Sequence, residues 1–212
     1  MLPLEIPAGT TVESLVREVV PELHGRLVPD GVPGDAFTVS VRVEGTGSYT
    51  VRIRGREMHV DRGETESRPT LWFFTTSRAV ERFLEDALGP RRFLPQSSQQ
   101  GLAVAIISDP RIVKRVAMAS GRIELALTDV DGERLAIVLG FGDATRRRID
   151  PEDADVVVEA EMMTLQRILD GRLLPEDALG DGDVKVRGNR FLAMQLALAV
   201  APFYPAAARK KR

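Results

Sequence analysis

The segment from Asp155 to Phe203 decides the fold of this chain. It begins with a predicted strand, 155–159, and a helix that ends at Ile168-Leu169-Asp170-Gly171, followed by Arg172-Leu173-Leu174-Pro175-Glu176-Asp177-Ala178-Leu179. It continues with Gly182-Asp183-Val184-Lys185-Val186-Arg187-Gly188-Asn189 and an apolar helix that starts at Phe191. Strands interleaved with helices of different character indicate an α+β fold for this part of the chain.

The sequence before residue 90 predicts a helix, four strands and a second helix. Apolar residues at helical spacing predict a helix over 11–24. Thr10 or Thr11 can cap the start of this helix, and Pro21 complicates the placement of its end. Alternation predicts strands over 37–43 and 49–54, and two further strands follow at 58–60 and 69–74. Thr75, Thr76 or Ser77 can cap a helix that runs to Leu88.

The middle of the chain predicts a linker and then a helix with a hairpin. Residues 91–100 are polar and rich in Gln and Ser, which favours a linker, and 102–107 form a short apolar segment. Asp109-Pro110 predicts the start of a helix that reaches Met118. Segments 123–127 and 135–139 then form a hairpin around Asp131-Gly132.

The two halves of the sequence repeat each other, which predicts an internal duplication. Gly55, Val60 and Gly63 correspond to Gly132, Ile137 and Gly140, while Val80 and Phe83 correspond to Leu165 and Ile168. The first copy is diverged and partial, because it lacks the strand at 182–189 and carries an additional strand at 37–43. We therefore divide the chain into 1–100, 101–205 and a basic tail, 206–212. The sequence leaves open whether the halves share one sheet.

Composition excludes several classes of function. The net charge of −2 gives no basic excess for nucleic-acid binding, and no cysteine is present for thiol chemistry or thiolate metal sites. His24 and His59 are far apart in sequence, and the Asp129-to-Glu133 segment fits a turn better than a calcium loop. No nucleotide-binding or nucleophile-elbow motif is present. We expect no metal, no cofactor and no catalysis, and a cytoplasmic location, since the apolar run 191–203 is too short to span a bilayer.

The order of motifs in roughly the second half resembles the sterol carrier protein 2 family. The resemblance spans about 105–203 and rests on Leu169, Gly171, Leu173, Pro175, Ala178, Gly182, Val184, Val186, Gly188, Asn189 and Ala193-Met194. It implies a mixed sheet covered by helices and non-catalytic binding, with transfer, of a sterol, fatty acyl, prenyl or other hydrophobic molecule in an apolar tunnel. One departure is the helix start at Ala160-Glu161-Met162-Met163, where the family has a Ser- or Thr-rich cap.

The apolar helix after Phe191 has two interpretations. Gln195 is its only polar side chain up to Phe203, so from the residues alone a core helix packed on every side is favoured. The resemblance implies instead that this helix borders the lipid tunnel. On that interpretation the lipid-binding residues are Phe191, Met194, Gln195, Leu198, Phe203, Met162 and Leu165.

Two alternatives to a free carrier remain open. The chain could be an accessory protein that presents a hydrophobic substrate to partner enzymes, or a filled-core interaction module without a ligand. The expected partners are a lipid or other hydrophobic small molecule, a transiently contacted membrane, and partner enzymes or a second copy of the chain.

Overall fold

The computed structural model describes residues 4–7, 9–28, 35–64, 69–82, 84–85, 92–93, 109–146, 154–169 and 172–200. Their main sheet contains β2 (Ala36–Glu44), β3 (Gly47–Arg54), β4 (Glu57–Arg62), β5 (Leu71–Thr76), β7 (Gly121–Thr128), β8 (Arg134–Phe141), β9 (Val156–Glu161) and β10 (Val184–Gly188). The helical elements are α1 (Val12–Ser14), η1 (Leu15–Val19), α2 (Val20–Leu27), α3 (Ser77–Arg82), α5 (Pro110–Ala119), η3 (Gly142–Arg146), α6 (Met162–Leu169), α7 (Pro175–Asp181) and α8 (Arg190–Val200). These bounds confirm the predicted α+β class.

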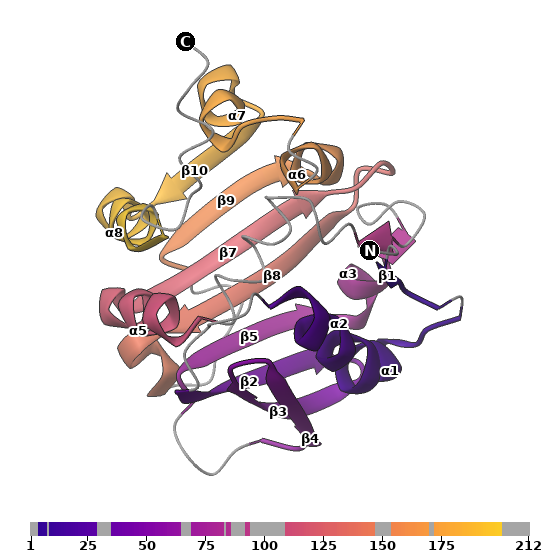
Figure 1. Cartoon of the computed structure of the whole chain (residues 1–212). Coiled ribbons are helices and arrows are strands. Elements are labelled where there is room, and N and C mark those ends of the chain that lie inside the picture. Colours follow the sequence, from indigo (N-terminus) through magenta and orange to yellow (C-terminus); the bar gives the residue numbers. More distant parts are fainter. Residues whose placement is uncertain are drawn as a thin grey trace.

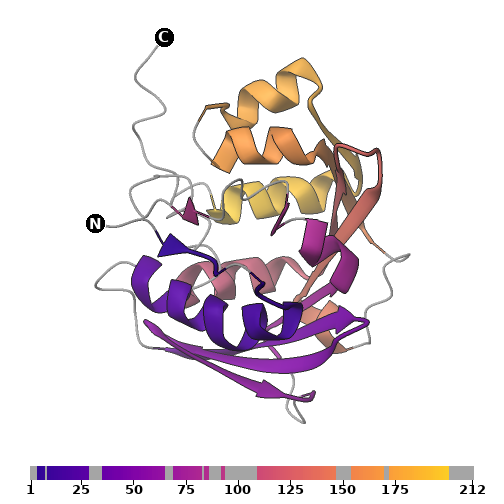
Figure 2. The same ribbon diagram turned by 90° about the vertical axis from the view of Figure 1, so that its right-hand side faces the viewer.

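One mixed sheet joins both halves of the described chain, in the order β10-β9-β7-β8-β5-β2-β3-β4 (Figure 1). The halves meet where β5 and β8 pair antiparallel, with Phe73 opposite Leu139. This pairing answers the question that the sequence left open, because the two halves share a single sheet. The helices lie on one side of it, as Figure 2 shows for α2, α5 and α8.

The two halves of the sheet have related strand orders. Each contains a hairpin whose first strand pairs parallel with a later strand: β2 with β5, and β7 with β9. Val39 is thus paired with Leu71, as Ile123 is with Val156. The strand of the first half without a counterpart is therefore β4, so the prediction that 37–43 is the additional strand is wrong. The repeat in the sequence matched Gly55, which lies between β3 and β4, with Gly132, which lies between β7 and β8. In the strand order, the β7–β8 hairpin corresponds instead to the β2–β3 hairpin. The duplication itself stays a hypothesis.

The first helix forms as predicted, but its interior contains a wider turn. The Thr11 side chain accepts a hydrogen bond from the Ser14 backbone N–H, while the Ser14 side chain accepts one from Thr11, which makes a capping box. The π-helical segment η1 precedes Pro21, which lies in the first turn of α2. A π-turn relieves the clash between a proline ring and the preceding helical turn, so the helix continues past Pro21 to Leu27.

The predicted caps and hairpin are present, with one difference in turn length. Thr76 accepts a hydrogen bond from the Ala79 N–H at the start of α3, and Asp109 accepts one from Arg111 at the start of α5. Strands β7 and β8 are joined by residues 129–133 rather than by two residues alone, because the Asp129 carboxylate accepts backbone N–H groups from Asp131 and Glu133. The predicted segment 102–107 lies outside the described residues. Within 91–100, Arg92–Phe93 forms β6, a strand paired with β1 (Leu4–Glu5).

Alternation along the strands separates a helix-facing side from an opposite side. Leu125 and Leu127 of β7 pack among the buried residues beneath the helices. On the opposite side, Trp72 and Phe74 form a buried cluster with Val138. Trp72 and Phe74 therefore lie on the side of the sheet away from Phe73.

Candidate functional site

The start of α8 is fixed by a contact to Asp155, the residue just before the strand β9. The backbone N–H of Asn189 donates to the carbonyl oxygen of Asp155 at 2.8 Å, and the Asn189 side-chain oxygen accepts the N–H groups of Phe191 and Leu192 at 3.1 Å. Gly188 makes this entry with φ of +89°, a conformation that side chains with a Cβ rarely adopt. The motif Gly188-Asn189 therefore holds the first turn of α8 against the sheet.

The helix α8 is almost entirely apolar in sequence but has two different faces in the structure. Leu192 and Leu196 are buried against Phe141 and Val156. The other face carries Phe191, Met194 and Leu198, which are 64%, 53% and 63% exposed and which we call the α8 ridge. Because one face is exposed, the interpretation of a core helix packed on every side is wrong.

The remaining predicted site residues fall into other environments. Met162 is 1% exposed and belongs to a buried cluster with Leu127 and Leu135, and Leu165 packs against it. Gln195 is half-buried on α8, and Phe203 lies outside the described residues. The structure therefore divides the predicted lipid-binding set into the α8 ridge and a separate core pair on α6.

The start of α6 also differs from the prediction. Ala160 and Glu161 belong to β9, so the helix begins at Met162. Met162 fills the core, whereas Met163 is 47% exposed. The local sequence gave no reason to separate the two methionines, because both precede the same apolar helical pattern.

Other apolar side chains exposed in the second half were not predicted as site residues. Besides Met163, they are Met118 of α5, Val130 of the β7–β8 turn, Leu139 of β8, Leu179 of α7 and Val186 of β10. Met118 is 82% exposed and lies on a helix whose Ile112 and Val113 are buried. No sequence pattern singled these residues out, since isolated exposed apolar residues are common.

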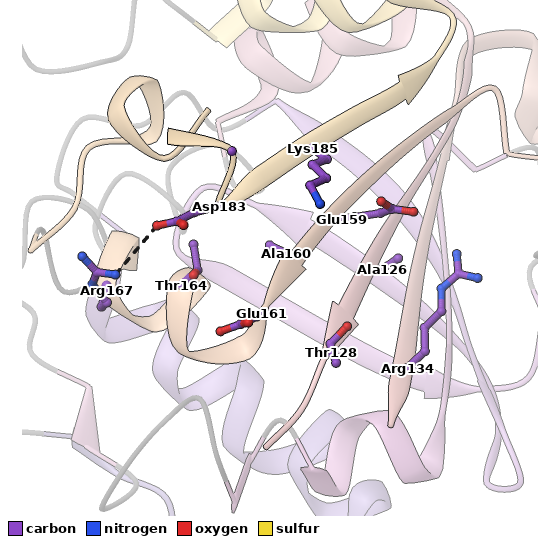
Figure 3. A pocket seen from close by; sticks show the side chains of 11 residues that line it. Ala126, Thr128, Arg134, Glu159, Ala160, Glu161, Thr164, Arg167, Asp183 and Lys185 are labelled. Atoms are coloured by element: carbon purple, nitrogen blue, oxygen red, sulfur yellow. Dashed lines mark ion pairs between the residues drawn. The ribbon is translucent and has the colours of Figure 1, made fainter. Parts of the chain in front are cut away.

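A polar pocket of about 500 Å³ lies at the end of β7 and β9 (Figure 3). It is lined by Ala126, Thr128, Arg134, Glu159, Ala160, Glu161, Thr164, Arg167, Gly182, Asp183 and Lys185. The side chains of Ala126, Thr128 and Glu159 alternate with helix-facing residues, so this part of the pocket opens on the opposite side of the sheet. Three cations and three carboxylates among its residues give it no apolar tunnel character. No local pattern in the sequence marks this pocket, since its lining residues come from separate strands and helices.

Several charges at the pocket are paired with one another or with neighbours. Arg134 contacts Glu124 at 2.7 Å, and Arg187 contacts Glu159 at 3.1 Å. Arg167 and Asp183 are 3.9 Å apart, at the long limit of an ion pair (Figure 3). Among the described residues, no group of three or more His, Cys, Asp or Glu side chains could hold a metal ion. In the same part of the chain, no helix is long and apolar enough to cross a membrane.

Comparison with known proteins supports the predicted resemblance. The sequence model of the SCP-2 sterol transfer family matches residues 105–200. A comparison with curated proteins gives no match.

Solved structures of sterol carrier proteins are also similar to the chain. Sterol carrier protein 2 from Yarrowia lipolytica, in its apo form, is 18% identical with a TM-score of 0.33, covering 41% of this chain and 76% of that one. Sterol carrier protein domain 2 of Helicoverpa armigera is 17% identical with a TM-score of 0.36, and the match covers 57% of this chain and 96% of that one. Sterol carrier protein 2 like 2 from Aedes aegypti is 20% identical with a TM-score of 0.29, and the match covers 41% of this chain and 90% of that one.

Proposed function

We propose, from the premise that residues 105–200 match the SCP-2 sterol transfer family, that this chain binds and transfers a hydrophobic molecule without catalysing a reaction on it. The ligand would be a lipid of sterol, fatty acyl or prenyl type, held against the helical side of the C-terminal half. The α8 ridge is the observation that carries this proposal.

The α8 ridge supports the proposal through the area that it leaves in water. Phe191, Met194 and Leu198 follow one another at spacings of three and four residues, which places them along one line of the helix. Covering apolar surface stabilises a complex by about 25 cal/mol for each Å² removed from water. A flexible apolar ligand tail laid along this line would gain that free energy, and methionine adapts its shape to irregular tails.

Native mass spectrometry of the freshly purified full chain tests this function. We expect a bound mass in the lipid range, and organic extraction would identify its class. The same protein should take up a fluorescent fatty acid or sterol probe after delipidation. A chain that carries no such mass and takes up neither probe would contradict lipid binding.

A second function, that of a filled-core module presenting its surface to partner proteins, is favoured by the packing at α6. Met162 is 1% exposed, and Leu165 packs against the same cluster, so these two predicted ligand contacts are occupied by protein atoms. On this reading the α8 ridge would contact a partner enzyme or a second copy of the chain. Sedimentation of the delipidated chain separates the two: a monomer that takes up lipid supports the carrier, and a ligand-free dimer supports the module.

A further inference from the structure

We infer that the polar pocket at the end of β7 and β9 binds a small amphoteric molecule, one that carries an ammonium group and a carboxylate or phosphate. This site does not depend on the proposed lipid function. The α8 ridge supplies none of its lining residues. Three observations carry the inference: the shape of the pocket, a hydroxyl at its wall that makes no hydrogen bond within the described protein, and two charges of opposite sign that make no ion pair.

The shape of the pocket follows from small residues placed between long ones. Ala126 is 3% exposed and lies directly beside Glu159 in the parallel pair of β7 and β9. Lys185 of β10 is opposite Glu159 on the next strand. Figure 3 shows the long side chains of Lys185, Glu159 and Arg134 near Ala126, whose small methyl group leaves space between them. A pocket of about 500 Å³ has room for a molecule of several heavy atoms.

The Thr164 side chain supplies an unused hydrogen-bonding group to this pocket. Thr164 is only 5% exposed, and it lines the pocket in the first turn of α6. Within the described part of the chain, its hydroxyl makes no hydrogen bond. The oxygen is not among the buried side-chain atoms that lack a partner, so it reaches the water of the pocket, and a polar group of a ligand would replace that water.

The ion pairs leave one cation and one carboxylate of the pocket unpaired. Arg134 is paired with Glu124, and Glu159 is paired with Arg187. Lys185 and Glu161 make no ion pair with any described residue. Figure 3 shows Lys185 on β10 and Glu161 at the end of β9, and the strand register places both side chains on the side of the sheet away from the helices.

This charge pattern selects the class of ligand. A simple anion would be attracted by Lys185 but repelled by Glu161. A simple cation would be attracted by Glu161 but repelled by Lys185. A lipid tail would desolvate the charged lining without replacing its hydrogen bonds. A molecule with both charges can place its anionic group at Lys185 and its ammonium group at Glu161, with charge-assisted hydrogen bonds to each.

Titration of the isotope-labelled full chain by NMR tests the inference. O-phosphoethanolamine and γ-aminobutyrate should shift the amide signals of Glu161, Thr164 and Lys185. Inorganic phosphate alone and ethanolamine alone, at matched ionic strength, should leave those signals in place. Addition of roughly 10 mM of each compound would reveal a dissociation constant near 1 mM. Unshifted signals with both amphoteric compounds, or equal shifts with phosphate alone, would overturn the assignment.

Variants of the pocket sharpen the test. Lys185→Met, Glu161→Gln and Thr164→Val should each weaken binding of the amphoteric probes by about tenfold. Lys114→Met on α5 and Glu57→Gln on the edge strand β4 remove matched charges elsewhere and should bind as the unaltered chain does. Because Thr164→Val could alter folding, the amide spectrum of this variant without ligand is first compared with that of the unaltered chain. If the spectra differ, binding of the probes by Lys185→Met decides the test. Unweakened binding in both Lys185→Met and Glu161→Gln would contradict the inference.

The amphoteric group could belong to a free molecule or to a lipid headgroup. Co-sedimentation with phosphatidylethanolamine vesicles distinguishes these sources, with phosphatidylglycerol vesicles as the control. If the unaltered chain sediments with phosphatidylethanolamine vesicles and the Lys185→Met variant does not, the site binds a lipid headgroup. Binding of the soluble probes without such retention assigns it to a free molecule. An α8 ridge variant that loses lipid uptake should keep the probe titration, so failure of one proposal is distinguishable from failure of the other.

Discussion

The guanidinium of Arg82 donates a hydrogen bond from Nε to Oδ2 of Asp129 at 2.6 Å, which ties helix α3 of the first half to the β7–β8 turn of the second. The Asp129 side chain is fully buried, and its other oxygen accepts the backbone N–H groups of Asp131 and Glu133 at 2.9 and 2.8 Å. One carboxylate therefore shapes the turn and joins the two halves of the sheet.

The pairing of Arg82 with Asp129 predicts a dependence of stability on pH. Burial raises the pKa of Asp129, but hydrogen bonds from Arg82 and from the backbone of Glu133 and Asp131 outweigh burial and hold that pKa below its usual range. Because the folded pKa is below the unfolded value of about 3.9, the carboxylate contributes its full stability above that pH. This contribution is lost as the pH falls through the folded pKa.

We therefore expect Asp129→Asn to be less stable than the unaltered chain at pH 7, and the difference to shrink as the pH falls below about 4. Urea midpoints measured across this range check the prediction. Glu57→Gln on β4 is the control, since its exposed side chain makes no such contacts among the described residues. A difference that stays constant down to pH 2 would contradict the assigned role of the Asp129 charge.

Met162→Ala should destabilise the chain by about 2–5 kcal/mol, because removal of a fully buried side chain leaves a cavity among Ala79, Leu127 and Leu135. Met163→Ala is the matched control, since its side chain is 47% exposed and should cost much less. Urea unfolding of both variants checks the prediction. Equal losses would mean that the two methionines do not differ in packing.

Gly188→Ala should destabilise the chain by about 1–3 kcal/mol and loosen the start of α8. A Cβ at this position would be 2.3 Å from the carbonyl oxygen of Asp155, the atom that accepts the Asn189 N–H, and φ is +89°. Gly180→Ala in α7 is the control, because its Cβ would meet nothing within 4 Å. Thermal unfolding measures the loss of stability, and hydrogen exchange of the Leu192 and Ala193 amides measures the loosening of the start of α8. Amide protection equal to that of the unaltered chain would show that the backbone accommodates the methyl group.

Tyr49→Phe should leave stability unchanged or raise it by about 1 kcal/mol. The Tyr49 ring is fully buried among Val12 and Val43, and its hydroxyl has no hydrogen-bond partner within the described part of the chain. Removing the hydroxyl removes a buried polar group while the ring keeps its packing. The free energy of unfolding in urea checks this, and a loss above about 1 kcal/mol would indicate that the hydroxyl is hydrogen-bonded in solution.

Met194→Glu should weaken uptake of a fluorescent fatty acid probe by at least about tenfold, because a charge on the α8 ridge would have to leave water when the ligand tail covers it. Thermal stability should change little, since Met194 is 53% exposed. Met118→Glu on α5 is the control, a matched substitution at a residue 82% exposed outside the ridge. Equal uptake by the two variants would contradict the role of the ridge.

Much of the secondary structure could be predicted because it depends on neighbours in the sequence. The alternation in β2 and β3, the Thr11 and Asp109 caps, and the turn that contains Gly132 are all readable from a few residues. The burial of the α8 side chains could not be predicted in this way. Its residues are almost all apolar, so the sequence contains no stripe to separate buried Leu192 from exposed Phe191.

The sequence by itself determined the element order and the resemblance of the C-terminal half to the sterol carrier protein 2 family, because periodicity, caps and motif spacing are local properties. Tertiary structure alone decided that β5 pairs with β8, which face of α8 is exposed, and that Lys185, Thr164 and Glu161 line one pocket. These features depend on the pairing of strand edges and on packing between distant segments. The free energies of such contacts depend on the assembled surfaces on both sides, which neither segment specifies alone.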